Sequence, residues 1–261
     1  MSKKISATII TLNEEEHLLE AIESLLPYVD EVVVVDSHST DQTASICQSL
    51  ASKGVVFAER KFEGHGDQKN YAASLCSHDW IFNLDADERL TPELGAFLKG
   101  EFQEIKEEKT LFSFKRLNFF AQKPIWHGGW DPDWKKRLYH RRYYCWSTPA
   151  VHEDLVKING KGEEEKKIPH HLWHYTFDNV EQQVQRNSYY AKLGARQLLQ
   201  KRRGIKPSFF LVVVRPLIKF LECYVWKKGF LDGQIGFMIA INAAYSLFLK
   251  YLYAHQGRVD S

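Results

Sequence analysis

The first hundred residues alternate between short apolar runs and longer segments with helical spacing. Four runs rich in β-branched residues are typical of strands: ISATIIT (5–11), EVVVVD (31–36), VVFAE (55–59) and DWIFNLD (79–85). Residues 14–26 and 40–53 have the helical spacing or the Ser/Thr start of helices. Strands and helices in alternation form right-handed βαβ units, so we predict an α/β fold with a mainly parallel sheet flanked by helices.

After residue 107 the pattern changes. Residues 110–120 and 135–144 indicate two further strands, with an aromatic, glycine-containing loop, WHGGWDPDW (126–134), between them. A helix is also expected to begin at Thr91, where a capping threonine precedes Pro92.

The last third of the chain is expected to be helical. The helical spacing begins at Val180, and Pro207 and Pro216 are expected to interrupt it. We therefore place a boundary near residue 178, with an α/β domain over residues 1–178 and a helical C-terminal extension over residues 179–261.

Composition excludes several classes of protein. The formal net charge of +2 gives no reason to expect nucleic acid as a partner. Four widely spaced cysteines indicate reduced thiols in the cytoplasm. No signal peptide is evident, and the longest uncharged apolar run, residues 235–249, is shorter than the roughly 20 residues of a spanning helix. We therefore expect no membrane span.

The C-terminal third is locally basic. No acidic residue lies between Lys192 and Lys206, and residues 201–230 interleave cations with aromatic and aliphatic side chains. Interfacial helices have this composition, which predicts peripheral attachment to a membrane surface. The alternatives are packing on the sheet or on a second subunit, as in a homo-oligomer.

Three carboxylates, Asp85, Asp87 and Glu88, follow the fourth expected strand. Ligands of open α/β sheets bind at the carboxyl ends of the strands. Carboxylate oxygens suit Mg²⁺ or Mn²⁺, so the pattern predicts a divalent cation held by Asp85 and Asp87. The alternative is that these residues only form the turn before the next helix.

Neither glycine-based phosphate loop is present in the sequence, so a diphosphate would need another source of positive charge. Asp36 ends the second strand, where a carboxylate can bind a base or a ribose. Lys69 is a candidate phosphate or base contact, with Gly64 and Gly66 allowing close backbone approach. The alternatives are a capping Asp36 and a surface Lys69.

Five segments together resemble the family 2 glycosyltransferases: TIITLNEE, VVVDSHSTDQT, GDQKNYA, FNLDADE and VHED, over residues 8–154. The segments WHGGWDPDWKKRLYHR, VHEDL and GFLDGQIGF are similar to lipopolysaccharide core β-glucosyltransferases. The resemblance implies a GT-A fold and inverting transfer from a UDP-sugar. It further implies glucose as the sugar and a lipopolysaccharide inner-core heptose as the acceptor, with the enzyme on the inner face of the inner membrane.

The resemblance also implies roles for individual residues. The uridine pocket would contain Thr11, Asn13, Glu14 and Asp36, with Lys69 near the nucleotide; Asp85 and Asp87 would hold the ribose and the metal. Many members carry D-D-G-S-T-D where this chain has VDSHSTD, so His38 replaces a glycine and only Asp36 can contact uracil.

On the acceptor side, Glu153 is the expected base and Asp154 the second choice, because a carboxylate can take the proton of an acceptor hydroxyl. His152 could orient the base or contact phosphate. Trp126 and Trp130 could present flat faces to sugar rings, or belong to the core.

Two other classes of function stay open at this point. His170 and His174 have the i, i+4 spacing of some zinc sites, which would suit a zinc-dependent hydrolase. The other class is a membrane-associated module that binds nucleotide sugars without catalysis.

Overall fold

The computed structural model describes residues 2–148, 153–201 and 203–257. The chain forms two compact units: Met1–Arg116 with Asp133–His174, and Leu117–Pro132 with Tyr175–Ser261. The compact units thus differ from a single division at residue 178, because the segment 117–132 belongs with the C-terminal helices. Separate roles for residues 1–178 and 179–261 stay a prediction.

Four parallel strands form one half of the sheet of the first unit, as the alternation predicted. They lie in the order β3-β2-β1-β4 and comprise β1 (Ile5–Thr11), β2 (Glu31–Asp36), β3 (Val55–Glu59) and β4 (Trp80–Asn83). The helices between them are α1 (Leu18–Leu25), α2 (Thr43–Ser49), with the 3₁₀ turn η1 (Ala51–Lys53), and α3 (His65–Leu75).

The helix expected from Thr40 begins only at Thr43, which corrects that prediction. The Asp41 carboxylate accepts hydrogen bonds from the backbone N–H groups of Thr43, at 3.0 Å, and of Glu15, at 3.1 Å. These bonds hold residues 39–42 as a turn against the loop after β1.

The second half of the sheet is antiparallel, so the sheet as a whole is mixed. β8 (Trp134–His140) pairs with β4, and the order continues through β6 (Leu111–Phe120), β11 (Glu165–Phe177) and the short β5 (Glu88–Leu90). The remaining elements are β7 (Lys123–Ile125), α4 (Pro92–Lys99), α5 (Glu101–Glu104), the pair β9 (Tyr144–Trp146) and β10 (Leu155–Lys157), and the 3₁₀ turn η2 (Ile158–Gly160). Thr91 caps α4 as predicted.

Both faces of the parallel half are covered. Val32 and Val34 of β2 join the cluster that contains the apolar face of α1, whereas Val33 and Val35 join the cluster that contains α3. Successive strand residues point to opposite faces, so the unbroken EVVVVD run reflects burial on both sides.

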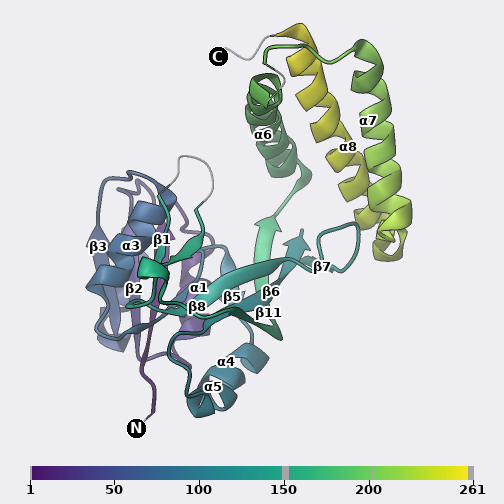
Figure 1. Cartoon of the computed structure of the whole chain (residues 1–261). Coiled ribbons are helices and arrows are strands. Elements are labelled where there is room, and N and C mark those ends of the chain that lie inside the picture. Colours follow the sequence, from purple (N-terminus) through teal and green to yellow (C-terminus); the bar gives the residue numbers. More distant parts are fainter. Residues whose placement is uncertain (1, 149–152, 202, 258–261) are drawn as a thin grey trace. The chain divides into compact units, whose positions relative to one another are not determined.

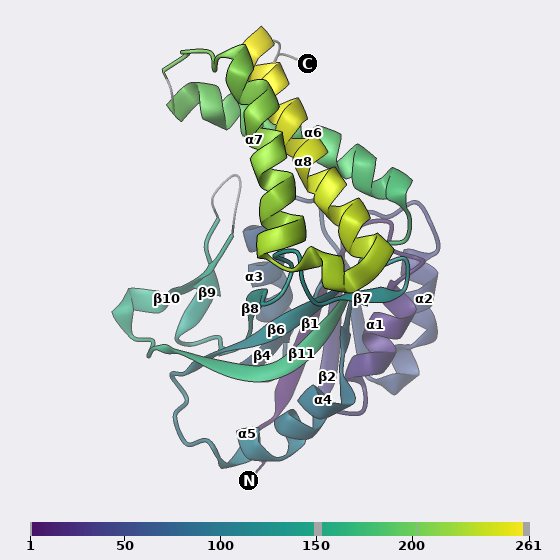
Figure 2. The same cartoon turned by 90° about the vertical axis from the view of Figure 1, so that its right-hand side faces the viewer.

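Helices dominate the second unit. They are α6 (Val180–Lys201), α7 (Phe209–Leu221), the π-helical turn η3 (Glu222–Trp226), the 3₁₀ turn η4 (Gly229–Asp232) and α8 (Gly233–Gln256). α8 packs against both α6 and α7, and the three helices lie side by side (Figures 1 and 2). Pro207 precedes α7 as expected, but Pro216 lies inside α7. That prediction of a break was wrong because burial of the Pro216 side of the helix holds α7 together.

The segment Gly229–Gln256 is the one helix of the described residues that is long and apolar enough to cross a membrane. It is longer than the uncharged run at 235–249 because it also includes Asp232 and Lys250. A soluble core helix can have the same composition, so the expected lack of a span stays a prediction.

Gly66 in the first turn of α3 gives the first test. A Cβ at this position would lie 1.9 Å from the carbonyl oxygen of Ser147 and 3.4 Å from the Cβ of Glu153. Gly66→Ala must push the two segments apart, and we expect a loss of about 1–3 kcal/mol in the free energy of unfolding. Urea unfolding would measure it, with the exposed Ser74→Ala in the same helix as control. Equal stability of the two variants would contradict this close approach.

Candidate active site

A buried guanidinium lies between two of the three carboxylates that follow β4. Arg137 of β8 places Nη2 2.6 Å from Asp85 Oδ2 and 2.5 Å from Glu88 Oε1. Arg137 and Glu88 are buried, and Asp85 is half-buried. Part of the positive charge that these carboxylates require therefore comes from the protein itself.

Lys69 of α3 supplies the second cation. Its Nζ lies 3.5 Å from Asp85 Oδ1 and 3.0 Å from Glu153 Oε1, and 4.4 Å from the ring centroid of Trp146. The side chain is buried, so the alternative of a surface lysine was wrong. One ammonium group thus joins the residue expected at the nucleotide, Asp85, to the expected base, Glu153.

These cations keep both carboxylates charged. Burial would raise the pKa of Asp85, but Arg137 and Lys69 outweigh burial and hold the pKa well below its usual range. Burial likewise would raise the pKa of Glu153, and Lys69 lowers it below the ordinary value of a glutamate. Both groups are therefore carboxylates at neutral pH.

Asp87 has a different partner. Its Oδ2 lies 3.1 Å from Nε2 of His174, which β11 carries opposite β5. Burial would raise the pKa of Asp87, and the hydrogen bond and charge of His174 lower it. A carboxylate and an imidazole side by side can hold a divalent cation and leave other positions for phosphate or water.

The zinc alternative does not fit this arrangement. His170 and His174 lie on one extended strand, where a spacing of four residues corresponds to about 13 Å. His170 instead packs against Phe97, with ring centroids 5.7 Å apart. Two ligands so far apart cannot bind one zinc ion.

The loops after β1 and β2 are tied together. Asn13 Oδ1 accepts from the backbone N–H of Thr40 at 2.8 Å, and the backbone N–H of Asn13 donates to Ser39 Oγ at 2.8 Å. Asp36 is buried and accepts from the N–H and the hydroxyl of Ser39, at 2.7 and 2.5 Å. Asp36 thus shapes this loop, and contact with uracil stays a prediction. His38 has φ of 63°, a conformation that glycine adopts without strain.

Two buried oxygens near these loops have no hydrogen-bond partner among the described residues: Thr11 Oγ1 at the end of β1 and Gln68 Oε1 in α3. Buried polar atoms are normally satisfied, so these two are candidates for ligand contacts. Thr11 was expected in the uridine pocket, whereas Gln68 was not singled out.

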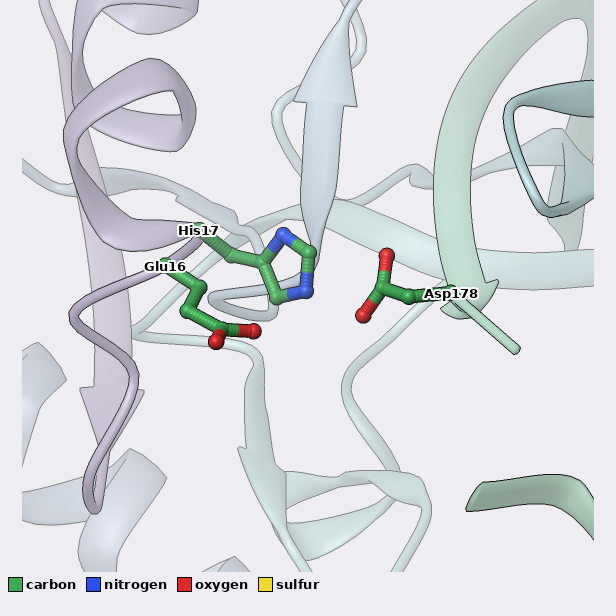
Figure 3. Close-up of side chains that lie close together, drawn as sticks. All are labelled: Glu16, His17 and Asp178. Atoms are coloured by element: carbon green, nitrogen blue, oxygen red, sulfur yellow. The ribbon is translucent and has the colours of Figure 1, made fainter. Parts of the chain in front are cut away.

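Glu14 begins the turn between β1 and α1, where its N–H donates to Thr43 Oγ1 at 3.0 Å. Glu16 and His17 follow in the same turn (Figure 3). Asp178, the third residue labelled in Figure 3, belongs to the second unit, and we assign no site to the three residues. Nucleotide contact by Glu14 stays a prediction.

The two candidate bases differ in their surroundings. Glu153 is half-buried beside Lys69, whereas Asp154 is exposed and pairs with Lys136 at 2.7 Å. His152 lies outside the described residues. Trp126 is exposed and Trp130 packs on Phe177 at 6.3 Å, both within the second unit. The acceptor roles of these tryptophans stay predictions.

Arg137 and Trp146 of this cluster were not singled out in the sequence, and His174 was singled out only as a zinc candidate together with His170. Arg137 lies in the basic segment KKRLYHR. The alternation of side chains along a strand would have placed it on the opposite face from Lys136 and Leu138. The pairing of β11 with β5, which brings His174 to Asp87, has no local signal in the sequence.

Arg137 gives the second test. Its removal leaves Glu88 buried beside Asp85 without the cation that lies between them, and breaking a buried pair typically costs 3–5 kcal/mol. We expect Arg137→Met to lose about that much in the free energy of unfolding. Arg142→Ala is the control, because it breaks a solvent-exposed pair with Asp79 and should cost at most about 1 kcal/mol. If urea unfolding gave similar losses of free energy for Arg137→Met and Arg142→Ala, the buried network around Arg137 would be contradicted.

Comparisons with known proteins agree with this sheet and its polar edge. The model of the family described as glycosyl transferase family 2 matches residues 6–155. An uncharacterized glycosyltransferase of Rickettsia conorii is 31% identical, covering 100% of this chain and 93% of its own. The lipopolysaccharide core biosynthesis glycosyltransferase LpsC of Rhizobium meliloti is also 31% identical, covering 98% of this chain and 96% of its own.

Two solved structures are more distant. TarS residues 1–349 of S. aureus has a TM-score of 0.46 at 13% identity, covering 97% of this chain and 90% of its own. Glucosyl-3-phosphoglycerate synthase of Mycobacterium tuberculosis, solved with Mn²⁺ and UDP, has a TM-score of 0.35 at 23% identity. The match covers 45% of this chain and 44% of the synthase. These two carry no argument about activity. The family model and the full-length relatives show that the chain is a member of glycosyl transferase family 2, with the GT-A fold expected from the sequence.

Proposed function

We propose that the chain is an inverting hexosyltransferase that moves glucose from UDP-glucose to a lipopolysaccharide inner-core heptose. The observation that carries this proposal is the position of Lys69, whose Nζ contacts Asp85 on one side and Glu153 on the other. A nucleotide bound at Asp85 and an acceptor activated by Glu153 would then meet at one point of the sheet edge.

In this mechanism Glu153 is the base. The acceptor hydroxyl attacks the anomeric carbon, its proton passes to Glu153, and the bond from that carbon to the phosphate oxygen of UDP breaks. Lys69 keeps Glu153 deprotonated, and it would lie close to where the charge of the departing diphosphate develops. Asp85, Thr11, Asn13, Glu14 and Asp36 would bind the nucleoside.

A divalent cation, Mg²⁺ or Mn²⁺, fits the residues at this edge. Asp87 and His174 offer a carboxylate oxygen and an imidazole nitrogen 3.1 Å apart, whereas both oxygens of Asp85 already face cations. Asp87 and His174 would therefore hold the ion, with Asp85 nearby. The bound ion would neutralise the leaving diphosphate.

The relative LpsC supports the choice of acceptor, because its name places it in lipopolysaccharide core biosynthesis. Another UDP-sugar, or another lipid-linked or polysaccharide acceptor, is the alternative within the same class. A non-catalytic binding module is the alternative from another class.

A lipid-linked acceptor suits a cytoplasmic protein attached to the inner face of the inner membrane, and the basic, apolar C-terminal third supports that location.

The third test is Glu153→Gln, assayed as UDP release with UDP-glucose, Mn²⁺ and a lipopolysaccharide truncated to expose the inner-core heptose. Loss of the base should lower turnover roughly 10²–10⁴-fold while UDP-glucose still binds. Parallel reactions with UDP-galactose and UDP-N-acetylglucosamine rank the donors.

Asp154→Asn is the matched control, because Asp154 is the adjacent carboxylate but faces Lys136 and solvent. It should keep most of the activity. A large loss in Asp154→Asn with full activity in Glu153→Gln would assign the base to Asp154, and no UDP release with any donor would favour the binding module.

A further inference from the structure

Exposed large apolar side chains concentrate in the second unit. Of 25 such side chains among the described residues, 14 lie between Ile205 and Tyr245. Four of them form one stripe on α7, spaced by three or four residues, with exposed fractions of 46–69%: Phe210, Val213, Leu217 and Leu221. Patches of this kind on a monomer mark an interaction site.

α7 carries apolar side chains over most of its surface. Val212 and Pro216, on a different side of the helix from the stripe, are buried, and α8 packs on α7. Arg215 and Lys219 lie roughly opposite the stripe, so α7 is an amphipathic helix with a wide apolar face and cations on its polar side, as in helices that lie at a membrane surface. Within the second unit, the helices cover only one side of α7 (Figures 1 and 2).

The turn after α7 continues the stripe. Trp226, Phe230 and Leu231 are exposed by 68%, 48% and 57%, and Lys227 and Lys228 lie between them. Tryptophan beside lysine is typical of the boundary between a bilayer and water. The turn is also anchored, because Asp232 accepts from the backbone N–H of His127 at 2.9 Å.

The excess of positive charge in the C-terminal helices favours a bilayer, rather than a second copy of the chain, as the partner of this surface. Residues 187–257 contain eleven Lys and Arg but only two acidic residues, Glu222 and Asp232. A symmetric dimer through this face would bring the same cations of both copies together. An anionic lipid surface instead attracts them.

We infer that the α7 stripe and the turn with Trp226, Phe230 and Leu231, together the α7 face, bind the surface of an anionic bilayer. This inference rests on the proposed membrane attachment and names the surface responsible. α7 would lie along the interface with its apolar stripe in the acyl region.

The same packing argues against α8 as a spanning helix. Asn242 of α8 is buried and donates to Gln183 Oε1 of α6 at 2.6 Å, so α8 is the inner helix of the three. The structure thus favours a chain that lies on the bilayer.

The fourth test is sedimentation of the full chain with vesicles of phosphatidylcholine, alone or mixed with phosphatidylglycerol. We expect preferential binding to the anionic vesicles, and a loss of roughly tenfold or more in the double variant Leu217→Ser, Leu221→Ser. The matched control is Tyr189→Ser, Tyr190→Ser, which removes side chains of α6 that are 62% and 55% exposed. This control should bind as the unchanged chain does.

Three results would overturn the inference: no binding to either vesicle, equal binding by the α7 variant, or protein that resists carbonate extraction as a spanning helix does. A dimer in light scattering that the α7 variant dissociates, without vesicle binding, would assign the face to a second copy. UDP binding by the same variants is measured separately, so failure here is distinguishable from failure of the proposed transferase activity.

Discussion

Two buried cations allow several carboxylates to lie close together at the carboxyl end of β4. Lys69 and Arg137 lie among Asp85, Glu88 and Glu153, and these carboxylates could not be placed together in a largely buried position without them. The cations come from α3 and β8, and the carboxylates from the segments after β4 and before β10. The site therefore exists only when the parallel and antiparallel halves of the sheet are joined.

Close packing around α3 fixes the geometry of this cluster. Gly66 lets the Ser147 segment approach the helix, and the Asn70 amide donates to the backbone oxygen of Trp146 and accepts from its N–H, both at 2.8 Å. The same Trp146 offers its ring to Lys69. α3 is polar in sequence but supports the site: the buried Lys69 pairs with Asp85 and Glu153, and the buried Gln68 donates through Nε2 to Ser37 Oγ at 3.2 Å.

Local pattern was sufficient for the parallel half of the fold, because strand composition and capping residues act over a few positions. It also singled out Asp85, Asp87 and Lys69 as candidates, and the family resemblance singled out Glu153; their roles stay predictions. It failed where distant strands pair: His174 approaches Asp87, which is 87 residues earlier in the chain, because β11 lies beside β5. Pro216 was misjudged because burial against α8 outweighs the local cost of proline.

The central claim is that this edge of the sheet binds a nucleoside diphosphate together with a divalent cation. Calorimetric titration of UDP into the full chain, with and without Mn²⁺, tests it most directly when repeated on Asp87→Ala and on Asp79→Ala, an aspartate at the opposite end of β4. The account predicts Mn²⁺-dependent binding that Asp87→Ala weakens by roughly tenfold or more and that Asp79→Ala leaves intact. Binding that is independent of Mn²⁺ and equal in all three proteins would contradict it, as would no binding of UDP at all.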